Sequence, residues 1–384
     1  MPWGGDNLMP YDILEKIEAD ETMVSCLEFN SEMCYGAGLT YDVTDCLPKD
    51  ARRVKDFFED NAVERYFMGV CHDFKYFGFC VSVIILSKNF KNIVRIRRKE
   101  AIYCRFGVAD KSGRISRVYY ANWRQNPDEK DIEEIEMLDE DAPLADLRER
   151  IEKGTASHKY AVVSRIPTVD STYYPIPYYA ALFKGHWYDI KQLIGAAKSA
   201  KLRNSAPLKY HIQIQSSYWE KLYEQEGITD PEEQRERANR QKQIFIDYLT
   251  GAENSGKVLF SEFEMNFDGK LTEDIRITKL DTATQGGDWS TDIQEAVNMI
   301  CFVLRVHPNL LGAVPGKSQS NNSGSDKREL YTIAQAIQKA HRDLLFSVHR
   351  LIIRFNNYAG ARPVCPILQL TTLDEHRDIK QSEI

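Results

Sequence analysis

The stretch TDIQEAVNMICFVLRVHPNLLG occupies residues 291–312, and it is followed by AVPGKSQSNNSGSDKR (313–328) and ELYTIAQAIQKAHRDLLFSVHRLIIRFNN (329–357). Thr291 and Gln294 have the spacing of a capping box, and Pro308 cannot continue a helix, so the first block predicts a helix over 291–306. The middle block is too polar to pack and predicts a loop. The last block carries apolar residues at helical spacing and predicts a long amphipathic helix.

A second long helix is predicted earlier in the chain. Pro177 suits a first helical turn, and residues 178–203 can form one helix of about 26 residues, or about 39 Å at 1.5 Å per residue. Lys184, Lys191 and Lys198 recur every seven residues and would share one face of this helix. Such a long helix with one basic side is difficult to bury in a small globule, and it fits a wall built from many copies.

A small α/β unit is predicted between the two long helices. Residues 208–215 alternate as a strand, and Asp230 with the proline after it predicts the start of a helix that runs to Thr250. Two more strands are expected over 257–267 and 273–280.

The chain before residue 175 predicts an α+β domain. Helical spacing of apolar residues indicates helices, and runs of β-branched and aromatic residues indicate strands. The expected helices cover 10–33, 49–60 and 62–76, and the expected strands cover 39–43, 77–86, 92–97, 100–106 and 116–122. The acidic stretch 128–146 is interpreted as a solvated surface segment. A short strand from Arg362 and a charged tail are expected at the end of the chain.

Composition limits the classes of function. The 384 residues carry a net charge of −7, whereas a chain that grips nucleic acid tightly usually contains a strongly basic domain. No run approaches the roughly 18 to 20 apolar residues that would span a bilayer, and the first residues lack the pattern of a secretory signal. A soluble protein made in a cytoplasm is expected.

Neither a metal nor a cofactor is expected. The eight cysteines are scattered without a C-x-x-C pair, so they are interpreted as reduced thiols and not as zinc ligands. His341 and His349 are two helical turns apart, which is too far for a chelating pair.

Two motifs resemble parts of enzymes. Gly312-Ala-Val-Pro-Gly-Lys-Ser318 has three residues where a Walker A phosphate loop has four, and it follows a helix instead of a strand. Glu262, Glu264 and Asp268 could form the metal-binding carboxylate group of a nuclease, but alternating charges on an edge strand explain them more simply. No catalytic residue is expected.

The order of these elements resembles the portal family of tailed bacteriophages. His307-Pro-Asn-Leu-Leu-Gly312 is similar to the portal pattern in which an apolar helix ends at a proline and Leu-Leu-Gly follows. The polar loop over 318–326 and Lys327-Arg-Glu-Leu then follow in the family's order. Trp3-Gly-Gly-Asp-Asn-Leu-Met-Pro10 and Tyr35-Gly-Ala-Gly38 are similar to the openings of portals. The likeness covers nearly the whole chain.

The resemblance implies an α+β portal fold that forms rings. Its parts would be a wing (1–174), a stem helix (175–204), a clip (205–286), a second stem helix (287–308), a tunnel loop (309–328) and the rest of the wing (329–384), with the helical crown absent or truncated. The residues that the tunnel loop would turn towards DNA are Lys317, Ser318, Gln319, Ser320, Asn321, Asn322, Ser323, Lys327 and Arg328. Lys184, Lys191 and Lys198 would form the basic face of the first stem helix.

The function implied by the resemblance is that of a conduit. A head-to-tail ring of about twelve subunits would stand at one capsid vertex of the virion, after assembly in the host cytoplasm, and double-stranded DNA would pass through it without sequence recognition. The implied partners are the terminase large subunit, a head–tail connector or neck protein, and the capsid and scaffold proteins, with no membrane.

Two other hypotheses stay open. A nucleotide-driven packaging enzyme, either a terminase or a nuclease, would need a true phosphate loop and a set of metal-binding carboxylates. A soluble binding protein unrelated to phages would be a monomer or a dimer in solution.

Overall fold

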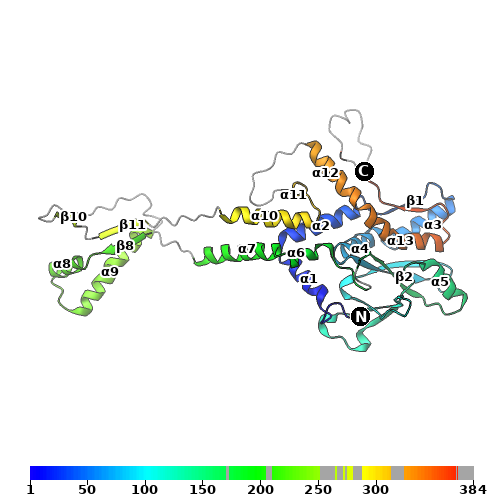
Figure 1. Ribbon diagram of the computed structural model, residues 1–384, viewed down its shortest axis with the longest axis horizontal. Helices are drawn as coiled ribbons and strands as arrows, with labels where there is room; N and C mark the ends of the chain where they lie inside the picture. The colour runs from blue at the N-terminus through cyan, green and yellow to red at the C-terminus, as the bar shows by residue number, and fades with distance from the viewer. Residues whose placement is uncertain are drawn as a thin grey trace. The chain divides into compact units, whose positions relative to one another are not determined.

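The computed structural model of the chain describes residues 1–169, 173–204, 210–250, 264–265, 271–272, 275–279, 288–312, 324–368 and 370. The chain forms two units (Figure 1). The first unit combines residues 1–194 and 289–384, and the second consists of residues 195–288.

A three-stranded antiparallel sheet lies at the centre of the first unit. Its order is β3 (Ile93–Lys99), β2 (Phe79–Leu86) and β7 (Lys159–Arg165). Because both faces of β2 are covered, its sequence is an almost continuous apolar run. Alternate residues of β2 enter two clusters of buried side chains: Phe79, Val81 and Val83 the first, and Cys80, Ile84 and Leu86 the second.

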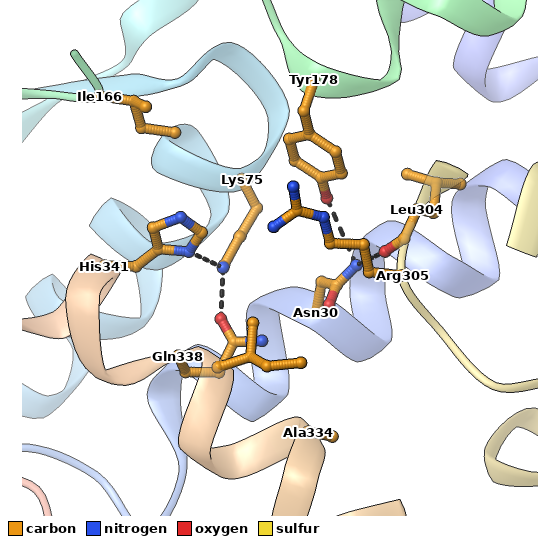
Figure 2. A pocket seen from close by; sticks show the side chains of 10 residues that line it. Asn30, Lys75, Ile166, Tyr178, Leu304, Arg305, Ala334, Gln338 and His341 are labelled. Atoms are coloured by element: carbon orange, nitrogen blue, oxygen red, sulfur yellow. Dashed lines mark hydrogen bonds between the residues drawn. The ribbon is translucent and has the colours of Figure 1, made fainter. Parts of the chain in front are cut away.

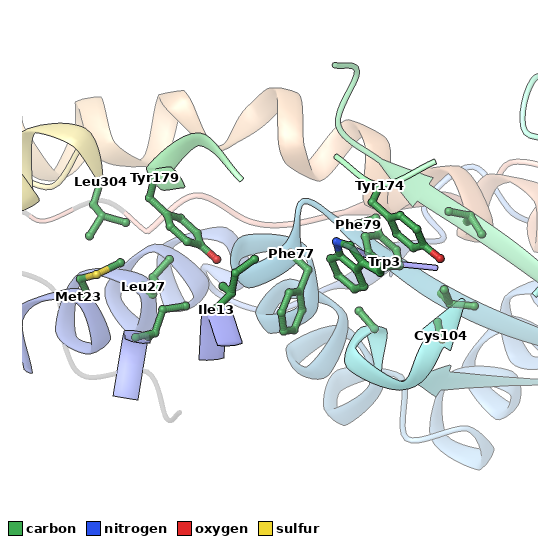
Figure 3. Packing of buried hydrophobic residues seen from close by; sticks show 14 of the residues in the cluster. Trp3, Ile13, Met23, Leu27, Phe77, Phe79, Cys104, Tyr174, Tyr179 and Leu304 are labelled. Atoms are coloured by element: carbon green, nitrogen blue, oxygen red, sulfur yellow. The ribbon is translucent and has the colours of Figure 1, made fainter. Parts of the chain in front are cut away.

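The first cluster joins this sheet to a second one (Figure 3). The second sheet contains β4 (Cys104–Phe106), β5 (Arg117–Tyr120) and β6 (Glu133–Glu136) in that order. Trp3 stacks on Tyr174 in this cluster, with 4.7 Å between the ring centroids. Three short 3-10 helices accompany the strands: η1 (Ala101–Tyr103), η2 (Trp123–Gln125) and η3 (Glu129–Asp131).

The second cluster lies on the other face of the central sheet. Helices α4 (Val63–Phe77) and α13 (Lys339–Phe355) contact this face, and α3 (Pro48–Asp60) and α5 (Pro143–Glu152) add further buried side chains. β1 (Thr40–Asp42) pairs antiparallel with β12 (Arg362–Val364), which ties the early part of the unit to its late part.

The predicted helix over 10–33 is wrong as a single element. It is divided into α1 (Met9–Glu18) and α2 (Glu21–Tyr35). Asp20 lies between them and accepts hydrogen bonds from the backbone N–H groups of Thr22 and Met23, so its side chain caps the start of α2.

The predicted helix over 178–203 is also interrupted. The chain forms η4 (Tyr178–Ala180), α6 (Ala181–Lys184) and α7 (Trp187–Asn204) instead. His186 has a φ of 64°, a left-handed conformation that cannot continue a right-handed helix. Lys184 therefore belongs to a different helix from Lys191 and Lys198.

The predicted helices after residue 287 are present with small changes. α10 (Asp288–Val303) begins three residues before Thr291. α11 (Pro308–Leu311) is a single turn, and the predicted helix over 329–357 is formed by α12 (Gly324–Ile337) and α13, with Gln338 between them. α12 thus takes up the last residues of the expected loop.

The described part of the second unit contains two two-stranded sheets and two helices. β8 (Tyr210–Ile214) pairs antiparallel with β11 (Ile275–Lys279), and β9 (Glu264–Met265) pairs with β10 (Leu271–Thr272). The helices are α8 (Ser216–Glu226), which was not predicted, and α9 (Pro231–Thr250), which was. Two hydrogen bonds of 2.6 and 2.7 Å from the Arg237 guanidinium to Glu226 join them.

Candidate functional site at the ends of the long helices

The residues predicted to face DNA divide into two groups. Lys317, Ser318, Gln319, Ser320, Asn321, Asn322 and Ser323 lie outside the described residues, so their role stays a prediction. Lys327 and Arg328 are described and are the fourth and fifth residues of α12, not part of a loop. Lys327 is exposed and Arg328 is half-buried.

Lys184, Lys191 and Lys198 do not form one basic face. Lys184 is exposed on α6, Lys198 is partly exposed on α7, and Lys191 is buried. The Nζ atom of Lys191 lies 2.9 Å from Asp20 Oδ1, 2.9 Å from Thr22 Oγ1 and 3.1 Å from Glu21 Oε1. The charge of Lys191 is therefore used to fix α7 to the start of α2.

The C-terminal end of α10 is fixed to the middle of α2. The Asn30 side chain donates a 2.8 Å hydrogen bond to the Leu304 carbonyl. Beyond it, Arg305 N–H bonds Phe302 O and Val306 N–H bonds Cys301 O, which together form a Schellman motif. Arg305 occupies the left-handed position of this motif, with a φ of 57°.

A pocket lies beside this helix end (Figure 2). Lys75 reaches it from α4, and its Nζ donates to Gln338 Oε1 and lies 2.5 Å from His341 Nδ1. Burial lowers the pKa of Lys75. Burial and the nearby charges of Lys75 and Arg305 lower the pKa of His341 to about 4, so its imidazole is neutral and accepts from Lys75.

Sequence reasoning did not find this pocket. Lys75 is the one cation on a face of α4 that also carries Cys71 and Phe74, and a lysine in such an apolar setting is the only local signal of burial. Arg305 and His341 come from distant parts of the chain, so only the fold brings them to Lys75.

Large apolar side chains are exposed on three of the long helices. Leu193 on α7 is 67% exposed, Phe302 on α10 is 75% exposed, and Ile333 on α12 is 56% exposed. Each helix therefore offers an apolar side chain to which a partner could bind.

The two motifs that resemble enzyme parts lie mostly outside the described residues. Of the Walker-like segment, Gly312 is described and residues 313–318 lie outside the described residues; Glu264 is on β9, whereas Glu262 and Asp268 are also outside. Among the described residues, no group of three or more His, Cys, Asp or Glu side chains could hold a metal ion. No helix in the described part of the chain is both long and apolar enough to cross a membrane.

No family model matches this chain, and no curated protein matches it. Its fold is similar to that of chains in solved assemblies of the gene transfer agent (GTA) particle. A chain in the virion of the native GTA particle is 12% identical, with a TM-score of 0.60 over 92% of this chain and 82% of that chain.

Two chains from GTA necks are similar to the same degree. One comes from the neck of the empty particle, computed with C6 symmetry; it is 13% identical, with a TM-score of 0.61 over 92% of this chain and 84% of that chain. The other comes from the neck of the native particle, computed with C12 symmetry; it is 14% identical, with a TM-score of 0.58 over 94% of this chain and 85% of that chain. The predicted α+β fold is confirmed, and it is a fold that virion neck assemblies contain.

Proposed function

We propose that this chain is one subunit of a portal-type ring in the neck of a tailed phage or phage-like particle, through which double-stranded DNA enters and leaves the capsid. The proposal rests mainly on fold similarity over 92–94% of the chain to chains of virion and neck assemblies. The C12 symmetry of one of those necks supports a ring of about twelve copies. The order of motifs in the sequence supports the same assignment.

The parts of the chain would divide the work. Residues 175–204 and 287–308 would be the stem, 205–286 the clip and 309–328 the tunnel loop, with the remaining residues forming the wing. The clip would bind the terminase large subunit and the head–tail connector, and the wing would contact the capsid and scaffold proteins. The ATPase that drives packaging would be a separate protein.

The exposed apolar residues of the long helices support contacts between copies. A closed ring of one chain needs head-to-tail contacts, in which one surface of each subunit meets a different surface of its neighbour. Leu193, Phe302 and Ile333 would be covered in such contacts, which accounts for their exposure in one chain.

The net negative charge of the chain supports a role in which DNA passes through the ring without binding tightly to it. Duplex DNA carries one negative charge per roughly 1.7 Å of its axis. A net charge of −7 on each of about twelve copies gives a ring of about −84, which opposes tight adhesion of a polyanion. The polar, Ser-rich and Asn-rich segment 318–326 would contact the passing backbone without reading sequence.

The mass and shape of the purified full-length chain test the proposal. Twelve chains of 44.3 kDa give a particle of about 530 kDa, which mass photometry resolves from a monomer or a dimer. Negative-stain images are expected to show rings with a central channel. A chain that stays monomeric at high concentration, or that hydrolyses ATP by itself, would overturn the proposal.

A single substitution tests the contact surface. Phe302→Asp places a charge where a neighbouring subunit would cover the phenyl group. The variant is expected to remain folded by circular dichroism but to fail to assemble into the particle of about twelve copies. Val108→Asp is the matched control, because Val108 is 71% exposed and lies outside the long helices. Equal assembly of the two variants would contradict the proposed interface.

A further inference from the structure

The pocket at the end of α10 gathers positive charge without a matching carboxylate. Lys75, Arg305 and His341 line a cavity of about 150 Å³, together with the amide of Asn30 and the hydroxyl of Tyr178 (Figure 2). No aspartate or glutamate is among its lining residues in the described part of the chain. The pocket is therefore a concentration of cations and hydrogen-bond donors.

Burial of the Lys75 charge at this position is energetically unfavourable. The side chain is only 3% exposed, and its two hydrogen-bond partners, Gln338 and neutral His341, carry no negative charge. No carboxylate is among the groups that raise the pKa of Lys75; these are Cys34 and Cys71, which act through their thiolate forms. The hydrogen bond with Cys71 and the charges of Lys75 and Arg342 lower the pKa of Cys34 to about 7, so one buried thiolate is the most that the protein itself offers to these two cations. A buried lysine normally has an anion beside it, because an unpaired charge in the interior is strongly unfavourable.

A further buried cation adds to the positive charge around Lys75. Arg342 is 7% exposed and donates to the carbonyls of Cys34 and Met33, 2.9 and 2.6 Å away. Its charge lowers the pKa of Lys75, as does that of Arg305. Carbonyl oxygens satisfy the hydrogen bonds of Arg342 but do not neutralise its charge.

Arg305 occupies a backbone position at which glycine is the usual residue. Its φ of 57° is the left-handed position of a Schellman motif, where glycine avoids the steric cost that any other residue meets. An arginine at this position destabilises the fold slightly, because its Cβ atom is crowded in the left-handed conformation. Its side chain points into the pocket (Figure 2). Six other non-glycine residues share this left-handed conformation, so the placement of the Arg305 side chain at the pocket, and not its backbone strain, supports a role there.

We propose that this pocket binds one small oxyanion of the size of inorganic phosphate. Lys75 and Arg305 would supply the charge, and the Tyr178 hydroxyl and the N–H of His341 that does not face Lys75 would supply further hydrogen bonds, while both N–H groups of Asn30 stay with Leu304 O and Tyr178. A DNA duplex, whose major groove alone is about 12 Å wide, is too large to enter the cavity.

The bound anion would connect both flanks of one segment. Leu304 and Arg305 precede residues 313–323, and Gln338 and His341 follow them. If the proposed function holds, the anion would set how firmly the two ends of the tunnel loop are held. Anion binding itself does not depend on the proposed function, because the pocket lies within one chain.

Titration of the full-length chain with sodium phosphate tests the proposal, in a buffer free of other oxyanions and with sodium chloride at matched ionic strength as the reference. Phosphate is expected to raise the melting temperature where chloride does not, and to broaden the ³¹P resonance of the free ion. An equal effect of both salts would overturn the proposal, because it would show only screening of charge.

Arg305→Gly separates binding from folding. Glycine suits the left-handed backbone, so the variant is expected to melt at the same temperature or higher without phosphate, and to bind phosphate at least roughly tenfold more weakly because a charged hydrogen-bond donor is lost. Asn357→Gly is the matched control, since Asn357 has a φ of 58° and is not among the lining residues; it should keep full affinity.

Two outcomes would overturn the proposal. One is an undiminished phosphate response in Arg305→Gly. The other is no phosphate response in the unaltered chain together with loss of assembly in Arg305→Gly, which would assign the pocket to a carboxylate of a neighbouring copy. Failure of the proposed function alone would leave a non-annular chain that still binds phosphate.

Discussion

Lys191 fixes the start of α7 through a charge pair that is almost completely removed from water. Its side chain is 7% exposed and that of Asp20 is 0% exposed, with 2.9 Å between Nζ and Oδ1. The same Asp20 oxygen accepts from Thr22 and Met23 N–H and so caps α2. One carboxylate thus sets both the start of α2 and the position of α7.

Removal of Lys191 should be costly. Lys191→Met leaves Asp20 buried without its countercharge, and we expect the free energy of unfolding to fall by about 3 kcal/mol, because an uncompensated buried charge is strongly destabilising. Urea denaturation followed by circular dichroism measures the change. Lys198→Met on the same helix is the control and should change stability by less than about 0.5 kcal/mol, since Lys198 is partly exposed. Similar losses in both variants would contradict a special role for the pair.

His349 makes the stability of the first unit depend on pH. It is 0% exposed, and its Nδ1 lies 2.7 Å from the Tyr41 hydroxyl. Burial lowers the pKa of His349 to about 3, whereas a histidine in an unfolded chain has a pKa near 6.5. Between about pH 3 and pH 6.5, His349 is therefore protonated in the unfolded state but not in the folded state. The contribution of His349 is fully present above about pH 6.5 and is lost as the pH falls towards 3.

His349→Phe should flatten this dependence. Between pH 6 and pH 4 the free energy of unfolding of the unaltered chain should fall by up to about 1.4 kcal/mol per pH unit from this one group, and the variant should lack that part of the slope. Denaturation midpoints at several pH values measure it. Tyr41→Phe retains the titrating imidazole and is expected to retain the slope, so equal slopes in the two variants would refute the assignment.

At the scale of elements, the sequence predicted best those whose signals are local. α9 begins after Asp230 and ends at Thr250 as expected, and α10 and α13 follow their apolar periodicity. β7 was not predicted, because its place depends on pairing with β2, whose residues lie far earlier in the chain. β6 was hidden in the acidic stretch 128–146: its glutamates are half-buried or exposed, and Ile135 alone is fully buried.

The candidate site was predictable only in part. The polar character of 318–326 is a property of composition and is visible in the sequence, whereas the burial of Lys191 requires knowing that α2 begins at Asp20. A seven-residue repeat of lysines indicated one basic face, but the left-handed backbone of His186 separates Lys184 from the rest. Side-chain caps and single left-handed residues carry too weak a periodic signal to be read without the fold.

Lys327 and Arg328 give a prediction at the level of α12. Cations at the start of a helix oppose its dipole, so Lys327→Gln with Arg328→Gln should leave stability unchanged or raise it by up to about 1 kcal/mol. If these side chains contact DNA, the double variant should nevertheless reduce the amount of DNA retained in a packaging assay. Lys49→Gln, in the first turn of α3, is the control for the dipole effect, because Lys49 is exposed. Unchanged DNA retention with higher stability would show that the two cations have no part in DNA passage.

The whole molecule divides its stabilising contacts unevenly between the two units. Both large clusters of buried apolar side chains consist of residues from 1–194 and 289–384, and none of the described residues of 195–288 belongs to either. Among the described residues of the second unit, Phe245 is the one large apolar side chain with less than a tenth of its surface exposed. The second unit is therefore an insertion that the first unit does not need in order to bury its core.

Replacement of residues 205–286 by a flexible Gly/Ser linker tests this division. Because loop closure entropy grows slowly with loop length and the buried clusters stay intact, the melting temperature of the first unit should shift by no more than about 2 °C. Differential scanning calorimetry measures it, with the full chain as reference. Under the proposed function the shortened chain should also lose affinity for a packaging motor while Lys191 and Asp20 still hold α7. A shortened chain that no longer unfolds cooperatively would contradict this division.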